Sequence, residues 1–153
     1  MENKQETIAI ASDHAGYAMK SFVKQFLSSA GYQVLDLGTH SEESCDYSDY
    51  GHALAEAVER GEVKRGVGIC GSGEGMAMTL NKHQGIRAAL VWDAEIARMT
   101  RLHNDANVLV LPGRYIDTAT AETCLQAFLT TSFEGGRHVR RLEKMPLQAT
   151  KKP

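Results

Sequence analysis

The sequence predicts an α/β fold, a three-layer αβα sandwich on a Rossmann-like five-stranded parallel sheet. Short apolar runs alternate with amphipathic stretches along the chain, which is the pattern of strands connected by helices. The 153 residues, 42% of them hydrophobic, are enough to bury most of the surface of the unfolded chain in one core. In open sheets of this kind, ligands bind beyond the C-terminal ends of the strands. Functional residues are therefore expected directly after each strand.

Five short apolar runs predict the strands. A strand buried on both faces of a parallel sheet has a continuous apolar sequence rather than an alternating one. The first run ends at Ser12 and the third ends at Cys70, and polar or glycine-rich residues that favour turns follow both. In chain order, the expected strands are residues 7–12, 32–37, 66–70, 86–92 and 107–111.

A helix is expected after each strand, because apolar side chains there recur at three- and four-residue spacing. Asp13, Asp93 and Asp117 are of a residue type that begins helices, whereas Gly31 and Gly135 are of a type that ends them. A short charged helix is expected near the C-terminal end of the sequence. The expected helices are residues 14–30, about 49–60, 74–80, 94–104, 118–133 and 138–145. Residues 1–145 are then a single domain and residues 146–153 a flexible tail.

The composition favours a cytoplasmic protein that acts on a small molecule. Its 17 Lys and Arg residues against 19 Asp and Glu residues give a formal charge of −2. No apolar run is long enough to span a bilayer or to form a signal peptide at the start, so no membrane partner is expected. The three cysteines form no CxxC pair, which argues against a disulfide framework or a zinc knuckle. The basic segment from Arg137 onward contains no aromatic residue for base stacking, so no nucleic acid partner is expected.

Residues 71–75, with glycine at alternate positions, are the first candidate functional loop. They follow a strand and begin a helix, so their backbone N–H groups can surround an anion. A dinucleotide fingerprint requires GxGxxG, and the third glycine here comes one residue too early. Cys70 lies directly before the loop, where the helix dipole and the N–H groups favour the thiolate over the thiol. The alternative is a cysteine that only packs in the core.

Histidine and arginine residues supply further candidates. His14, His103 and His138 follow or end predicted elements, but no HxH or HExxH spacing joins them, so no metal site is expected. Arg137 and Arg141 are four residues apart and share one face of a helix. They can bind a phosphate together, or they can belong to a solvated helix face.

Seven motifs occur in order along the chain: Ser12-Asp13-His14-Ala15-Gly16, Asp46-Tyr47, Ile69-Cys70-Gly71-Ser72-Gly73-Glu74-Gly75, Asn81-Lys82, Gly85-Ile86-Arg87-Ala88, Arg101-Leu102-His103-Asn104-Asp105-Ala106-Asn107-Val108-Leu109 and Glu134-Gly135-Gly136-Arg137-His138. This order resembles the type B ribose-5-phosphate isomerase family, which also has allose- and galactose-6-phosphate members, over about residues 8–143. The resemblance implies a sugar phosphate as small-molecule partner and no metal or organic cofactor. It also implies a homodimer or a dimer of dimers, with an active site shared between two subunits.

The resemblance further implies roles for residues at matching positions. Cys70 corresponds to the base that moves a proton between C1 and C2, His103 to the acid/base that opens the sugar ring, and Ser72 to a hydroxyl linked to ring opening. The implied substrate contacts are Asp13, His14, Tyr47, Gly71, Gly73, Glu74, Gly75 and Asn104 at the sugar, and Arg114, Arg137, His138 and Arg141 at the phosphate. Another branch of the family has a glutamate base directly after the last glycine of the loop. Met76 stands there, so this chain resembles the cysteine branch.

We therefore expect an isomerase that interconverts ribose 5-phosphate and ribulose 5-phosphate through an enediolate. The thiolate would transfer the proton, the loop N–H groups would stabilise the enediolate, and the arginines would anchor the phosphate. An allose or galactose 6-phosphate isomerase is the alternative of the same class, because one more carbon changes little in these motifs. A non-catalytic module that binds a phosphosugar is the alternative of another class.

Overall fold

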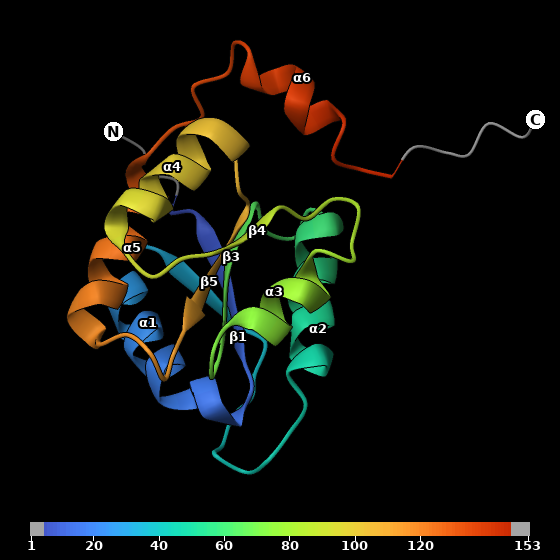
Figure 1. The fold of residues 1–153 in the computed structure, drawn as a ribbon. Helices are drawn as coiled ribbons and strands as arrows, with labels where there is room; N and C mark the ends of the chain where they lie inside the picture. Colours follow the sequence, from blue (N-terminus) through green and yellow to red (C-terminus); the bar gives the residue numbers. More distant parts are fainter. Residues whose placement is uncertain (1–4, 148–153) are drawn as a thin grey trace, which may run out of the picture.

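The computed structural model describes residues 5–147 and contains a parallel sheet with helices on both faces (Figure 1). The strand order is β2-β1-β3-β5-β4, and every pair is parallel. The strands are β1 (Thr7–Ser12), β2 (Gln33–Asp36), β3 (Arg65–Cys70), β4 (Ala88–Leu90) and β5 (Val108–Pro112). The helices are η1 (His14–Gly16), α1 (Tyr17–Ser29), α2 (Tyr47–Glu59), α3 (Glu74–Leu80), α4 (Ala94–Asn104), α5 (Thr118–Thr130) and α6 (His138–Glu143). The predicted three-layer sandwich with five parallel strands is confirmed.

The sheet has an apolar cluster on each face. Alternate residues of β1 point to opposite faces, so Ile8 and Ile10 belong to one cluster while Ala9 and Ala11 belong to the other. The first cluster includes side chains of α1, α4 and α5, and the second includes side chains of α2 and α3. Cys70 packs in the second cluster, and its sulfur therefore lies on the face that α3 covers.

Two predicted elements differ in detail at their starts. Asp13 caps the expected helix, since its Oδ1 accepts the Gly16 N–H (3.0 Å), but the first turn is the 3-10 turn η1 and the α-helix begins only at Tyr17. The edge strand β4 spans three residues rather than the predicted 86–92. The N–H groups at its start are bound by side-chain oxygens, that of Arg87 by Asn107 (2.8 Å) and that of Ala88 by Asn81 (2.9 Å).

The C-terminal elements are shorter than predicted. Helix α5 ends at Thr130 rather than at 133, because Thr131 has an extended backbone and its carbonyl accepts a hydrogen bond from Arg101 Nε (3.1 Å). Helix α6 ends at Glu143, and most of the expected tail, residues 148–153, lies outside the described residues. Within residues 5–147, every helix is too short or too polar to cross a membrane.

Candidate active site

Cys70 ends the central strand β3, at the end of the sheet where all the parallel strands have their C-termini. The Gly113 N–H donates to the Cys70 carbonyl (2.9 Å), which ties the ends of β3 and β5 together. Gly73 has a left-handed backbone (φ 78°), and a Cβ there would lie 2.5 Å from Leu90 Cδ1. The loop therefore requires glycine at this position. Its course brings backbone N–H groups from Gly73 to Met76 against the Cys70 sulfur.

The predicted lowering of the Cys70 pKa is wrong for the chain by itself. Burial raises the pKa of this thiol, and the charge of Asp13 acts in the same direction. The N–H groups of Met76, Gly73 and Gly75 lower the pKa, but by less than burial raises it. Cys70 is 4% exposed, so loss of hydration exceeds the effect of the helix N-terminus, and the resting group at neutral pH is the thiol.

An open cavity of about 430 Å³ lies in front of Cys70. Residues that follow β1 and β3, the start of α2 and the segment after β5 all contribute to it. Its lining residues are Asp13, His14, Ala15, Tyr47, Cys70, Gly71, Ser72, Glu74, Gly75, Met78 and Arg114. The structure thus brings together most of the predicted sugar contacts, and adds Met78, which lies outside the sequence motifs, and Ala15, to which its motif gave no role.

Backbone contacts hold the polar side chains of this cavity in place. His14 Nδ1 accepts the Cys45 N–H (3.1 Å), so the backbone of Cys45 orients the imidazole. Ser72 Oγ accepts the Glu74 N–H (3.3 Å) at the turn into α3. The ring of Tyr47 lies directly on the loop, since a Cβ on Gly75 would be 2.5 Å from it. The sequence does not predict that Cys45 orients His14, because the two residues are 31 positions apart.

The remaining predicted residues lie at the opposite end of the sheet, where the strands begin: His103, Asn104, Arg137, His138 and Arg141 (Figure 1). His103 is near the end of α4, shortly before Val108 begins β5 and pairs with Gly66 at the start of β3. Cys70 pairs with Pro112 at the other end of the same two strands. Four residue steps of parallel strand separate the two pairs, which is about 13 Å along the sheet. One chain therefore does not bring His103 to Cys70.

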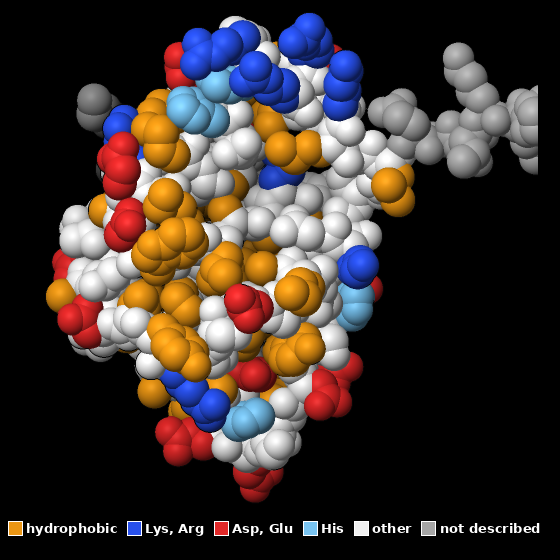
Figure 2. Space-filling view, viewed as in Figure 1, with side chains coloured by type: hydrophobic (Ala, Val, Ile, Leu, Met, Phe, Trp, Pro, Cys, Tyr) orange, Lys and Arg blue, Asp and Glu red, His pale blue; other side chains and the backbone are white. Residues whose placement is uncertain are grey.

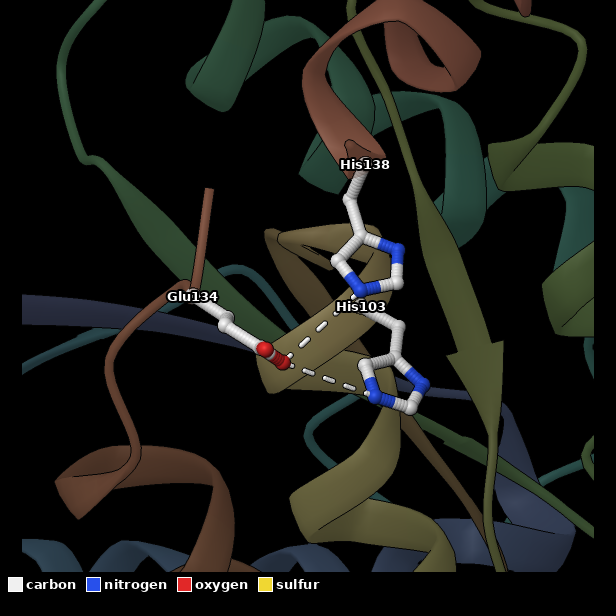
Figure 3. A group of neighbouring side chains, drawn as sticks. All are labelled: His103, Glu134 and His138. Carbon is white, nitrogen blue, oxygen red and sulfur yellow. Dashed lines mark ion pairs between the residues drawn. The ribbon is translucent and has the colours of Figure 1, made fainter. Parts of the chain in front are cut away.

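His103 and His138 form a cluster with Glu134 (Figure 3). The two imidazole rings are stacked, with centroids 4.5 Å apart and planes inclined by 19°. Glu134 Oε2 lies 3.7 Å from the Nε2 atom of each ring. Burial lowers the pKa of His138, the charges of His103, Arg137 and Arg141 lower it further, and Glu134 opposes the shift.

The same three side chains carry the atom types that bind metal ions. Their donor atoms lie within 4.8 Å of one another, which is close enough to share one ion. The rings of His103 and His138 are nearly parallel, however, so the lone pairs of their Nε2 atoms run side by side instead of converging. Zinc bound by two imidazoles and a carboxylate needs each donor to point at the ion from about 2 Å. The arrangement fits a carboxylate shared by two imidazoles better than a metal centre.

Asn104 is separate from both groups. It lines a second cavity of about 440 Å³, together with Asn81, Arg87, Thr100 and Met145 among others. The two cavities are almost equal in volume, so volume does not select the site. The cavity at Cys70 is the better candidate because it is lined by a thiol, by the carboxylates of Asp13 and Glu74, and by the glycine loop.

A parallel αβα sandwich with a thiol and a glycine loop at the C-terminal ends of the strands, and clustered imidazoles at the opposite end of the sheet, is the framework of a small-molecule enzyme. The chain belongs to the Ribose/Galactose Isomerase family, whose model matches residues 8–145, and it is an isomerase. The family resemblance expected from the ordered motifs is confirmed.

Named relatives are similar over nearly their whole length. The ribose-5-phosphate isomerase B of Escherichia coli is 40% identical over 136 residues, 89% of this chain and 91% of that protein. A ribose 5-phosphate isomerase of Thermotoga maritima is 46% identical, with a TM-score of 0.91 and coverage of 92% of this chain and 97% of that chain. The ribose-5-phosphate isomerase B of Mycoplasma genitalium, solved with bound ribulose-5-phosphate, is 38% identical, with a TM-score of 0.87 and coverage of 91% and 93%.

Proposed function

We propose that this chain interconverts D-ribose 5-phosphate and D-ribulose 5-phosphate, with Cys70 as the base and His103 as the group that opens the sugar ring. The observation that carries the proposal is the cavity of about 430 Å³, in which the thiol, the glycine loop and the predicted sugar contacts face one another. The similarity to ribose 5-phosphate isomerases along the whole domain supports the same substrate.

The chemistry follows from where the groups lie. Once the ring is open, Cys70 in its thiolate form, the minor form at neutral pH, removes the proton on C2 of the aldose and returns it to C1, while the proton of the C2 hydroxyl passes to the C1 oxygen. The N–H groups of Gly73, Gly75 and Met76, which surround the sulfur, also face the charge that develops on the enediolate oxygens. The phosphate, bound by arginines, fixes the reacting carbons over the sulfur. Each of these steps uses a group of the chain itself, so the proposal includes no metal or organic cofactor.

We also propose that the active site is shared within a homodimer. Cys70 lies at the C-terminal ends of the strands and His103 near their N-terminal ends, so a complete site requires two copies. The exposed apolar side chains of Met78 and Trp92, 67% and 55% exposed, flank the edge strand β4 and offer a surface for the partner. Figure 2 shows hydrophobic side chains gathered over the middle of this face.

Charge complementarity supports the same pairing. Lys and Arg side chains gather over α6 at the top of Figure 2, while Asp and Glu side chains predominate toward the bottom. The segment that leads into α2, beside the Cys70 cavity, contains the acidic residues Glu42, Glu43 and Asp46. A second copy in the opposite orientation places its basic helix near this segment, where it also supplies arginines for the phosphate.

The direct test compares isomerisation of ribose 5-phosphate, allose 6-phosphate and galactose 6-phosphate by the purified chain. We expect ribose 5-phosphate to have the highest kcat/KM. A higher value for either hexose phosphate would assign the chain to the hexose branch. Cys70→Ala should abolish turnover and leave binding of ribose 5-phosphate largely intact, and turnover near the wild-type rate in that variant would remove Cys70 from the role of base.

A further inference from the structure

Glu134 is an acidic residue to which neither the motifs nor the proposed reaction assigns a task. It precedes α6, and its carboxylate oxygen Oε2 lies 3.7 Å from His103 Nε2 and 3.7 Å from His138 Nε2. Figure 3 shows both rings turning the same edge toward this carboxylate. One negative charge is therefore placed against the proposed ring-opening group and against the imidazole stacked on it.

Backbone contacts fix this placement, so it does not depend on a free side chain alone. The Glu134 N–H donates to the Leu102 carbonyl (3.0 Å), one residue before His103. Gly135 and Gly136 then adopt left-handed conformations (φ 72° and 58°), which turn the chain back on itself. The turn brings His138, 5% exposed, over the ring of His103.

We propose that Glu134 is a positioning residue for ring opening: its carboxylate holds the Nε2 side of His103 and so directs Nδ1 to the sugar. The inference rests on the proposed function. Nδ1 takes the proton of the C1 hydroxyl as the bond between C1 and the ring oxygen breaks, and then gives that proton to the ring oxygen. No proton is gained or lost overall. While His103 carries the proton it is an imidazolium, and the facing carboxylate stabilises it.

The surroundings direct this charge to His103 rather than to His138. Burial lowers the pKa of His138, and the charges of His103, Arg137 and Arg141 lower it further against the opposing charge of Glu134, so His138 is neutral at pH 7. A neutral, buried ring stacked on His103 limits its rotation. At 3.7 Å, the carboxylate lies within ion-pair distance of His103 Nε2 once this ring is protonated.

The experiment uses the two sugar phosphates to separate ring opening from proton transfer. Ribose 5-phosphate is cyclic, whereas ribulose 5-phosphate cannot close a five-membered ring because its C5 oxygen carries the phosphate. Exchange of the C1 hydrogen of ribulose 5-phosphate with deuterium from solvent therefore reports on Cys70 without ring opening. Glu134→Gln keeps the shape of the side chain and removes the charge, and Glu143→Gln on α6 is the matched control.

We expect Glu134→Gln to lower kcat for ribose 5-phosphate by about tenfold or more, a part of the usual contribution of a general acid–base group. Its KM and its rate of C1 exchange with ribulose 5-phosphate should change by less than about twofold, and Glu143→Gln should match the wild type in both assays. Glu134→Asp, which keeps the charge on a shorter side chain, should recover part of the lost kcat.

Several results would overturn the inference. Equal losses in both assays would show that Glu134 only supports the structure or the phosphate site. An unchanged kcat would show that it has no part in ring opening. Loss of wild-type activity after treatment with a chelator, restored by zinc, would show that the three side chains bind a metal. A wild type inactive in both assays would instead overturn the proposed function, on which this inference rests.

Discussion

Mixing two inactive variants tests whether the active site is shared between subunits. Cys70→Ala removes the proposed base, and His103→Ala removes the proposed ring-opening group at the opposite end of the sheet, where β3 and β5 begin. If each site takes Cys70 from one subunit and His103 from the other, neither homodimer has a complete site. A heterodimer of the two variants has one complete site and one site that lacks both groups.

The expected activity follows from this arrangement. Random pairing of equal amounts gives heterodimers in about half of all dimers, and each has one functional site of two, so the mixture should recover about a quarter of wild-type activity. A dimer of dimers gives the same fraction. The assay is turnover of ribose 5-phosphate after the two variants are unfolded and refolded together, with each variant refolded alone as the control. Activity in the mixture no higher than in the separate variants would refute the shared site.

Three further predictions concern the thiol, the fold and the loop. Because burial raises the pKa of Cys70 above its ordinary value of 9.0, kcat/KM for ribose 5-phosphate should still be increasing with pH at pH 9, and a maximum near pH 6 would contradict this. Lys20, 3% exposed, is paired with Asp36 (2.5 Å), and Lys20→Met should lower the free energy of unfolding by about 3 kcal/mol in urea denaturation at pH 7. Burial raises the pKa of Asp36 but hydrogen bonds from Lys20 and Gly38 bring it below its ordinary 3.8, so this loss should shrink as the pH falls below about 4. Gly73→Ala should cost about 2 kcal/mol through backbone strain and also lower kcat, whereas Gly31→Ala, equally left-handed (φ 93°) but remote from the cavity, should lower stability alone.

The sequence was informative wherever a structural signal is local. The apolar runs predicted all five strands, and Asp93 and Asp117 cap the helices that they were expected to begin, each accepting an N–H three residues on. Gly31, with its left-handed backbone, follows α1 as expected for a helix end. These features depend on neighbours within one turn of helix, so composition and spacing are enough to find them.

The features that the sequence did not predict depend on contacts between distant segments. The Cys70 pKa depends on how completely three strands and α3 exclude water from the sulfur, and the local rule for a helix N-terminus gives the opposite direction. The sequence shows Glu134 only as the first residue of a motif with no role of its own, and the hydrogen bond of its N–H to Leu102, 32 positions earlier, brings its carboxylate to His103. The shortening of β4 likewise depends on the side chains of Asn81 and Asn107, which lie outside the strand.

The alternation of strands and helices itself explains why the proposed catalytic groups are apart. In a parallel sheet all strands end at one end of the sheet, and every connecting helix returns the chain to the other end. Cys70 ends a strand and His103 lies at the end of a helix, so within one chain they lie at opposite ends of the sheet, and the conformation of the loops does not change this. A reaction that needs both groups then requires a second copy in the opposite orientation. A twofold axis supplies that copy and makes two identical sites at once, which is why association and catalysis should be lost together.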